Sequence, residues 1–215
     1  MIHRLSLPRQ VPILDLGAGT GANMRMLKDL GFLAIRGLDS SDFAIRFCDK
    51  KGLGVVDKAD VCQMPYADET FHFVLAADML EHVANDLKAL KEIWRVLQPG
   101  GCAVITVPAF QYLWGVQDLT AQHHRRYDMK HLRQAAIEAG FDCLDSFYFN
   151  YLLFTLILIV RKLVNLFHFP LENENRLNSP WINELLKWIF YVDVETAPFV
   201  RPLVGVSILL IVRKS

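Results

Sequence analysis

The chain has 215 residues, a formal net charge of zero and a hydrophobic fraction of 53%, which is typical of one domain with room for a sizeable insertion. Because no net positive charge exists to attract nucleic acid, we expect no nucleic-acid partner. The four cysteines are scattered without a Cys-x-x-Cys pair, which indicates buried thiols in a reducing compartment and neither a disulfide framework nor a zinc site.

The first two-thirds of the chain alternates predicted strands and helices. The strands are almost continuous apolar runs, as expected of a parallel sheet that is covered on both faces. Such a series predicts an α/β fold, a doubly wound sheet with right-handed crossovers. We expect strands at residues 12–16, 33–38, 54–56, 71–76 and 102–107, and helices at 21–30, 41–51, 85–97 and 129–139.

The last third contains a long apolar insertion, residues 151–199, between two predicted strands at 141–149 and 204–212. A second aromatic helix is expected at 181–191. The uninterrupted apolar run of the insertion is too short to span a bilayer, which takes about 20 residues. Its neighbours Arg161 and Lys162 suit anionic headgroups. A lid over an acceptor, an interfacial anchor, a dimer surface and a buried helical cap all remain open.

A glycine-rich turn follows the first predicted strand. Gly17, Gly19 and Gly21 stand at alternate positions, and a helix is expected to begin directly after them. Glycine permits backbone angles that a Cβ would forbid, and the helix N-terminus offers unpaired N–H groups, so this layout is typical of a loop that binds a nucleotide. The loop alone does not choose the ligand, because Gly17, Gly19 and Ala22 also fit the dinucleotide fingerprint.

Two acidic residues follow later strands. Asp39 ends the second predicted strand, where a carboxylate can accept hydrogen bonds from both hydroxyls of a ribose. The alternative is a helix N-cap, which Ser40 or Ser41 would serve equally well. Asp60 follows the third strand, where it could accept from an adenine amino group while Val61 packs on the ring; the alternative is a solvated loop acid.

Together these motifs resemble the class I S-adenosylmethionine-dependent methyltransferases, specifically the type 11-like family. The resemblance is strongest over residues 11–107 and implies a Rossmann-like, mostly parallel sheet with a final antiparallel strand. Glu81-His82-Val83 and the run at 95–101 have no counterpart in nicotinamide dehydrogenases. The motifs are Asp15-Leu16-Gly17-Ala18-Gly19-Thr20-Gly21, Asp39, Asp60-Val61-Cys62-Gln63-Met64-Pro65-Tyr66, Phe71-His72-Phe73-Val74, Glu81-His82-Val83 and Arg95-Val96-Leu97-Gln98-Pro99-Gly100-Gly101.

The resemblance also implies a role for each cofactor-binding residue. The methionine end of S-adenosylmethionine would be held by Asp15 and the loop residues Gly17, Ala18, Gly19 and Gly21. The ribose would be bound by Asp39 and Ser40, and the adenine by Asp60 and Val61. Ala77 and Asp78, at the end of the fourth strand, would flank the sulfonium.

Candidate catalytic residues lie in Glu81-His82 and in the loop after the fifth strand, Gln122-His123-His124-Arg125-Arg126-Tyr127. Methyl transfer depends mostly on alignment, and a base is needed only for an acceptor that is protonated in its ground state. We take His82, His123, His124 and Tyr127 as catalytic candidates. Arg125 and Arg126 are candidates for binding the acceptor, since guanidinium groups suit phosphate or carboxylate.

Each of these candidates has a plainer alternative. The Glu-His pair more often shapes the cofactor site, and the loop could be a basic helix entry with Asp128 as N-cap. Gln122 stands where the resemblance predicts glycine. No metal ligand set is expected.

The sequence therefore predicts one methyltransferase domain, residues 1–215, with 151–199 as a hydrophobic helical insertion. The acceptor is expected to be small or lipid-like. A nicotinamide- or nucleotide-dependent Rossmann enzyme and a non-catalytic cofactor-binding partner subunit remain as alternatives. Because residues 1–5 lack the apolar core of a signal peptide, we expect the cytoplasm, with peripheral membrane contact open. The acceptor atom and the oligomeric state stay undetermined.

Overall fold

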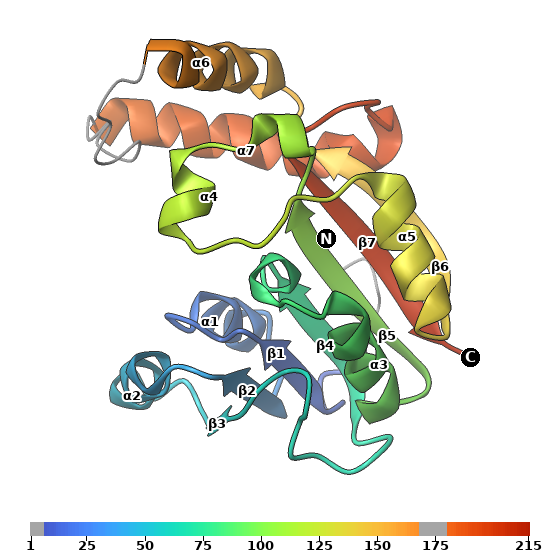
Figure 1. The fold of residues 1–215 in the computed structure, drawn as a ribbon. Coiled ribbons are helices and arrows are strands. Elements are labelled where there is room, and N and C mark those ends of the chain that lie inside the picture. The colour runs from blue at the N-terminus through green and yellow to red at the C-terminus, as the bar shows by residue number, and fades with distance from the viewer. Residues whose placement is uncertain (1–6, 168–179) are drawn as a thin grey trace.

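The computed structural model describes residues 7–167 and 180–215. Residues 1–5, on which the signal-peptide expectation rests, lie outside the described residues. The middle of the apolar insertion, residues 168–179, lies outside them as well. The sheet has the order β3-β2-β1-β4-β5-β7-β6, and β7 runs antiparallel to both of its neighbours (Figure 1). This confirms the predicted doubly wound sheet with its final antiparallel strand. The strands are β1 Ile13–Leu16, β2 Ile35–Asp39, β3 Val56–Lys58, β4 Phe71–Ala77, β5 Leu97–Pro108, β6 Phe141–Phe149 and β7 Ser207–Lys214.

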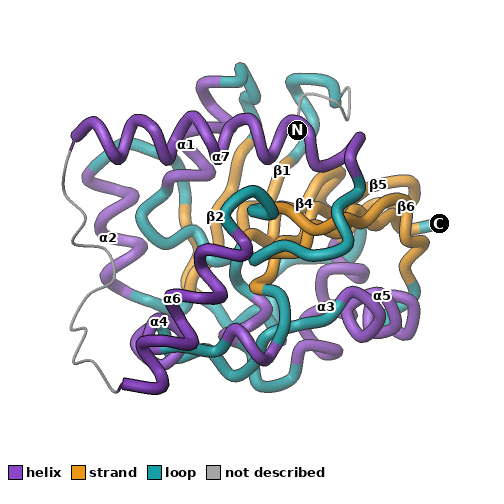
Figure 2. The backbone as a smooth tube through the Cα atoms, turned by 90° about the horizontal axis from the view of Figure 1, so that it is seen from above, coloured by secondary structure: helices purple, strands orange, loops and turns teal. Residues whose placement is uncertain are grey.

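Helices cover both faces of this sheet (Figure 2). One face packs against α3 and α5 through Leu90, Ile93 and Leu132, and the other against α1 and α7 through Leu27 and Ala197. The α-helices are α1 Ala22–Asp29, α2 Asp42–Lys50, α3 Asp86–Val96, α4 Val116–Thr120, α5 Met129–Glu138, α6 Phe154–Phe167 and α7 Pro180–Val200. Two 3₁₀ turns bear on the site, η2 Leu80–His82 and η3 Gln111–Leu113.

The strand β5 is longer than predicted because it begins at Leu97, inside the sequence expected only to end a helix. The helix does end there, at Val96, but the chain continues directly into the sheet. A Cβ at Gly101 would lie 2.8 Å from the Gln98 carbonyl oxygen and 2.9 Å from that of His72. Glycine therefore lets β5 pass close to the neighbouring backbone at this point.

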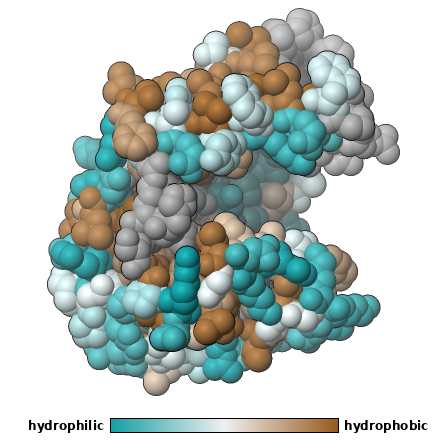
Figure 3. All heavy atoms as spheres, turned by 180° about the vertical axis from the view of Figure 1, so that it is seen from behind, coloured by the Kyte–Doolittle hydropathy of each residue, from teal (hydrophilic) through white to brown (hydrophobic). Residues whose placement is uncertain are grey.

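The insertion between β6 and β7 forms α6 and α7, and α7 extends well beyond the predicted 181–191. Asp193, only 1% exposed, ties α7 to the end of β6 by accepting from the N–H groups of Asn150 (2.6 Å) and Leu152 (2.8 Å). In Figure 1 both helices lie at the same end of the molecule as α4. Figure 3 shows apolar side chains gathered over that end. Among the described residues, no helix has the length and apolar character needed to cross a membrane.

Candidate functional site

A cleft of about 1190 Å³ opens beyond the carboxyl ends of the parallel strands β1, β2 and β4. This is the edge at which doubly wound sheets bind ligands. Four predicted cofactor residues, Asp15, Ala18, Gly21 and Ala77, are not among its lining residues, whereas the other seven are. The lining residues are Gly17, Gly19, Leu38, Asp39, Ser40, Ala59, Asp60, Val61, Cys62, Asp78, Met79, His82, Val83, Ala84, Asn85, Lys88, Gln122 and His124.

The glycine loop forms one wall of the cleft, and its geometry explains its composition. Gly17, Gly19 and Gly21 have φ values of 70°, 51° and 72°, in the left-handed region that side chains disfavour. Gly21 is the N-cap of α1, and a Cβ there would come within 2.2 Å of Leu53 Cδ1. The loop therefore keeps its shape only with glycine and presents backbone to the cleft.

Asp39 holds this loop from the end of β2. Its Oδ2 accepts from the Gly19 N–H and its Oδ1 from the Ser41 N–H, each at 2.8 Å. Ser41 is the N-cap of α2, so the capping role considered as the alternative for Asp39 belongs to Ser41. The Asp39 carboxylate lines the cleft in a fixed orientation, and its predicted role at the ribose stays a prediction.

Asp15 lies beneath the loop and is completely buried. Its Oδ1 accepts from Asn23 Nδ2 at 3.3 Å, but its Oδ2 has no hydrogen-bond partner among the described residues. Burial, above all, raises the pKa of this carboxyl to about 7. A buried carboxyl with an unpartnered oxygen is stabilised by a nearby cation, so Asp15 suits a ligand with an ammonium group on this side.

A second buried carboxyl, Glu81, lies in η2 close to two histidines. Glu81 is 1% exposed, its Oε2 has no partner among the described residues, and burial followed by the charge of Asp78 raises its pKa to about 8. The rings of His82 and His123 pack edge to face with centroids 4.7 Å apart. His123 Nε2 lies 4.0 Å from Glu81 Oε1. Of these groups His82 lines the cleft, and Glu81 and His123 lie directly behind it as candidate proton-exchange partners.

The same three residues are the group in the described chain best placed to hold a metal ion. Their ligand atoms all lie within 4.8 Å of one another. Ligands around a tetrahedral zinc ion are about 3.4 Å apart, so the side chains would have to close in to bind it. Burial lowers the pKa of His82, which keeps that imidazole neutral near pH 7. The present spacing favours acid–base chemistry over a metal centre.

The loop after β5 brings Gln122 and His124 to the cleft but uses its arginines elsewhere. The His124 N–H donates to the Glu81 carbonyl at 2.7 Å, and its side chain lines the cleft. Arg125 donates to the Ala84 carbonyl at 2.6 Å and pairs with Asp86. Gln122 has a φ of 57°, a left-handed angle that explains why the resemblance predicts glycine there.

Arg126 and Tyr127 are both buried, and their polar atoms bond within the protein. Arg126 Nε donates to Asp118 Oδ1 at 2.8 Å, and the Tyr127 hydroxyl donates to Asp86 Oδ2 at 2.9 Å. Burial, followed by the Asp86 charge, raises the pKa of Tyr127. The geometry favours structural roles for both residues over the predicted roles in acceptor binding and catalysis.

Sequence reasoning missed Asp118, which lies in α4 and is completely buried. Its Oδ1 lies 2.8 Å from His123 Nδ1, an arrangement that orients an imidazole. An acid five residues before a loop histidine was the available signal. Its helix is only five residues long, and the periodicity of the sequence does not reveal it.

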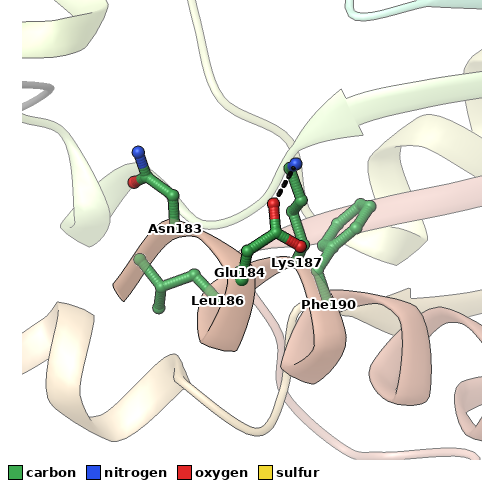
Figure 4. Close-up of a pocket in the computed structure, with 5 residues that line it drawn as sticks. All are labelled: Asn183, Glu184, Leu186, Lys187 and Phe190. Atoms are coloured by element: carbon green, nitrogen blue, oxygen red, sulfur yellow. Dashed lines mark hydrogen bonds and ion pairs between the residues drawn. The ribbon is translucent and has the colours of Figure 1, made fainter. Parts of the chain in front are cut away.

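A second cavity, of about 640 Å³, lies along α7 (Figure 4). Its described lining residues are Asn183, Glu184, Leu186, Lys187 and Phe190, and Lys187 pairs with Glu184 at 2.6 Å. This cavity and the main cleft have no described lining residue in common, and no described residue of α6 or α7 lines the cleft. The described part of the insertion therefore contributes no residue to the cleft lining, and its role as a lid stays a prediction.

Comparison with known proteins agrees with this geometry. Residues 14–105 match the family model described as a methyltransferase domain. The chain is 28% identical over 145 residues to cycloartenol-C-24-methyltransferase 1 of Oryza sativa subsp. japonica, covering 64% of this chain and 39% of that protein. It is 34% identical over 105 residues to a tRNA (carboxymethyluridine(34)-5-O)-methyltransferase of Arabidopsis thaliana, covering 47% of this chain and 25% of the relative.

The fold is also found in solved structures. The crystal structure of a putative sarcosine dimethylglycine methyltransferase from Galdieria sulphuraria superposes with a TM-score of 0.65 at 22% identity, covering 100% of this chain and 83% of the other. That likeness concerns the fold alone. The chain spans less than half the length of the curated relatives it matches, from 25% to 43% of them. The sterol and tRNA names among those relatives show that the shared region is compatible with very different acceptors.

Proposed function

We propose that this chain, whose residues 14–105 match a methyltransferase domain, transfers a methyl group from S-adenosylmethionine to a small or lipid-like acceptor. The observation that carries the proposal is the cleft walled by glycine backbone, together with the buried Asp15 beneath its glycine loop, whose Oδ2 has no partner among the described residues. That site suits a cationic nucleoside ligand, and members of this family use S-adenosylmethionine. The sterol methyltransferases among the relatives support a lipid-like acceptor.

The residues divide the work between holding the cofactor and managing a proton. Asp39 would bind the ribose, Asp60 and Val61 the adenine, and Asp15 the ammonium of the methionine end. S-adenosylmethionine supplies a methyl group that is already activated as a sulfonium. The protein therefore has to align the acceptor and, where the acceptor is a hydroxyl or an ammonium, to remove its proton. We assign that proton to His123 Nε2, the ring nitrogen that faces Glu81.

Calorimetry with S-adenosylhomocysteine and with NAD tests the cofactor assignment. We expect tighter binding of the first than of the second, because the buried Asp15 suits an ammonium group, which S-adenosylhomocysteine carries on its amino-acid end and NAD lacks. Preferential binding of NAD would refute the proposal. The acceptor is then sought by incubating the protein with S-adenosylmethionine and a sterol, a quinone or a total lipid extract, and by mass spectrometry for a product heavier by one methylene. Tight cofactor binding without turnover on any lipid would favour the non-catalytic alternative.

We further propose that the α6–α7 face rests on a membrane surface, where a lipid-like acceptor is available. Trp181, Trp188 and Tyr191 of α7 are 70%, 64% and 67% exposed. Aromatic side chains with a polar edge are favoured where one end is apolar and the other wet. At about 25 cal/mol per Å², burying the exposed part of each tryptophan would contribute roughly 3 kcal/mol.

Co-sedimentation with lipid vesicles tests this second proposal. We expect the chain to pellet with vesicles of mixed zwitterionic and anionic phospholipid, and Trp181→Ser with Trp188→Ser to weaken pelleting by at least tenfold. Phe43→Ser is the matched control, because Phe43 is 66% exposed but lies on α2. No pelleting of the wild-type chain, or equal loss in the control variant, would contradict membrane contact and leave a dimer surface or a structural cap.

A further inference from the structure

We propose that Asp118 is a positioning residue that connects helix α6 to His123, so that Arg161 of the apolar insertion helps to set the orientation of the imidazole. The inference rests on the proposed function for the role of His123 as proton acceptor. It adds that Arg161, which lies on α6 and outside the cleft lining, helps to orient the His123 ring.

The first link runs from Asp118 to His123. Asp118 Oδ1 lies 2.8 Å from both His123 Nδ1 and Arg126 Nε, and its Oδ2 accepts from the Gly115 N–H at 2.9 Å. The His123 backbone N–H also donates to the Asp118 carbonyl, at 2.9 Å. Because the carboxylate engages Nδ1, the proton stays on that nitrogen and Nε2 is left as the acceptor facing Glu81.

The second link runs from Asp118 to the insertion. Arg161 is only 7% exposed, and its Nη1 lies 3.7 Å from Asp118 Oδ2. The same guanidinium donates to the Leu113 carbonyl and, at 3.1 Å, to Gln117 Oε1. Burial alone would raise the pKa of Asp118, but its hydrogen bonds, first that from Arg126, lower it below the ordinary value. An ionised carboxylate between two guanidinium groups holds α4 and α6 together.

The side chains of Arg161, Asp118 and Arg126 are buried and that of His123 is only 15% exposed, so the loss of one partner affects the others. Breaking a buried ion pair by removing one side leaves an uncompensated charge, whereas exposed pairs contribute little. Without Arg161, Asp118 and Gln117 lose a shared donor, and the short helix α4 loses its contact with α6. We expect the His123 ring to become less fixed although it does not touch Arg161.

Nuclear magnetic resonance of the histidine rings tests the inference without a substrate. At pH 8, the wild-type chain should show His123 as a single tautomer with its proton on Nδ1, protected from exchange with water. Arg161→Gln should give mixed tautomers or a rapidly exchanging Nδ1 proton, and Arg161→Lys should restore part of the signal. Arg201→Gln is the matched control: Arg201 also binds a carboxylate, Asp145, but it is half exposed and lies far along the chain from α4.

Asp118→Asn should disturb the same signal more strongly, provided that circular dichroism shows a folded chain; Arg161→Gln keeps the test valid if it does not. With a methyl acceptor in hand, Arg161→Gln should lower kcat on the order of tenfold or more and leave the KM for S-adenosylmethionine within about twofold. A His123 signal that is the same in Arg161→Gln, Arg201→Gln and wild type would overturn the inference. Failure to bind S-adenosylhomocysteine would instead refute the proposed function and leave the tautomer result standing.

Discussion

The buried carboxyl of Asp15 makes cofactor affinity depend on pH. In the free protein its pKa is about 7, because burial disfavours the charged form. An ammonium group beside it favours the ionised form, so binding should release a proton near neutral pH. With a pKa of about 7, the ionised fraction rises from about 9% at pH 6 to about 91% at pH 8. Affinity for S-adenosylhomocysteine should therefore increase about tenfold, or about 1.4 kcal/mol, over that range.

The same carboxyl affects the stability of the free protein in the opposite direction. Its folded-state pKa lies above the ordinary value of 3.8, so the stability linked to its neutral form is fully present below about pH 4. That stability is lost as the pH rises through 7. A difference of about three pKa units corresponds to about 4 kcal/mol. Asp15→Asn keeps an oxygen for Asn23 and removes the ionisation, so it should unfold at a higher temperature than wild type at pH 8.

Calorimetric titration with S-adenosylhomocysteine at pH 6, 7 and 8, in two buffers that differ in ionisation enthalpy, measures both affinity and proton release. We expect about half a proton released at pH 7 in the wild-type chain and none in Asp15→Asn. Glu81→Gln is the control, because Glu81 also has a raised pKa, of about 8, and should change the proton count less if it does not meet the ammonium. Proton release that persists in Asp15→Asn would refute the reasoning.

Three further predictions follow from single contacts. Asp39→Ala should weaken S-adenosylhomocysteine binding by about 1.5–3 kcal/mol in calorimetry, while Asp42→Ala, which removes an exposed ion pair, should not; equal affinities would exclude the ribose role. Gly21→Ala should lower the unfolding free energy in urea by about 1–3 kcal/mol, because its Cβ would meet Leu53 and its φ is left-handed; an unchanged midpoint would disprove this packing. Tyr127→Phe should cost about 1 kcal/mol of stability and leave methyl transfer intact, and a large loss of turnover in the folded variant would restore its catalytic role.

The sequence was sufficient to predict most of the sheet because its strands are apolar runs bounded by glycine and polar turns. The strand at Phe141–Phe149 has its predicted bounds, and the helices α1, α2, α3 and α5 lie within one residue of theirs. The local sequence pattern predicted the elements less well where apolar residues do not recur at a regular spacing. The short helix α4 has no repeating apolar face, and the length of β5 depends on the close approach of Gly101 to a neighbouring strand.

The glycine loop with Asp15 and Asp39 could be predicted because these residues belong to one contiguous unit of strand, turn, helix and second strand. The polar loop at residues 122–127 could not be divided correctly from sequence, since all six of its side chains are polar. Only the tertiary structure shows that His123 faces Glu81 whereas Arg126 and Tyr127 are buried. The reason is physical: the partners of these side chains, such as Asp118 in α4 and Asp86 in α3, come from other elements, and only chain folding brings them within hydrogen-bond distance.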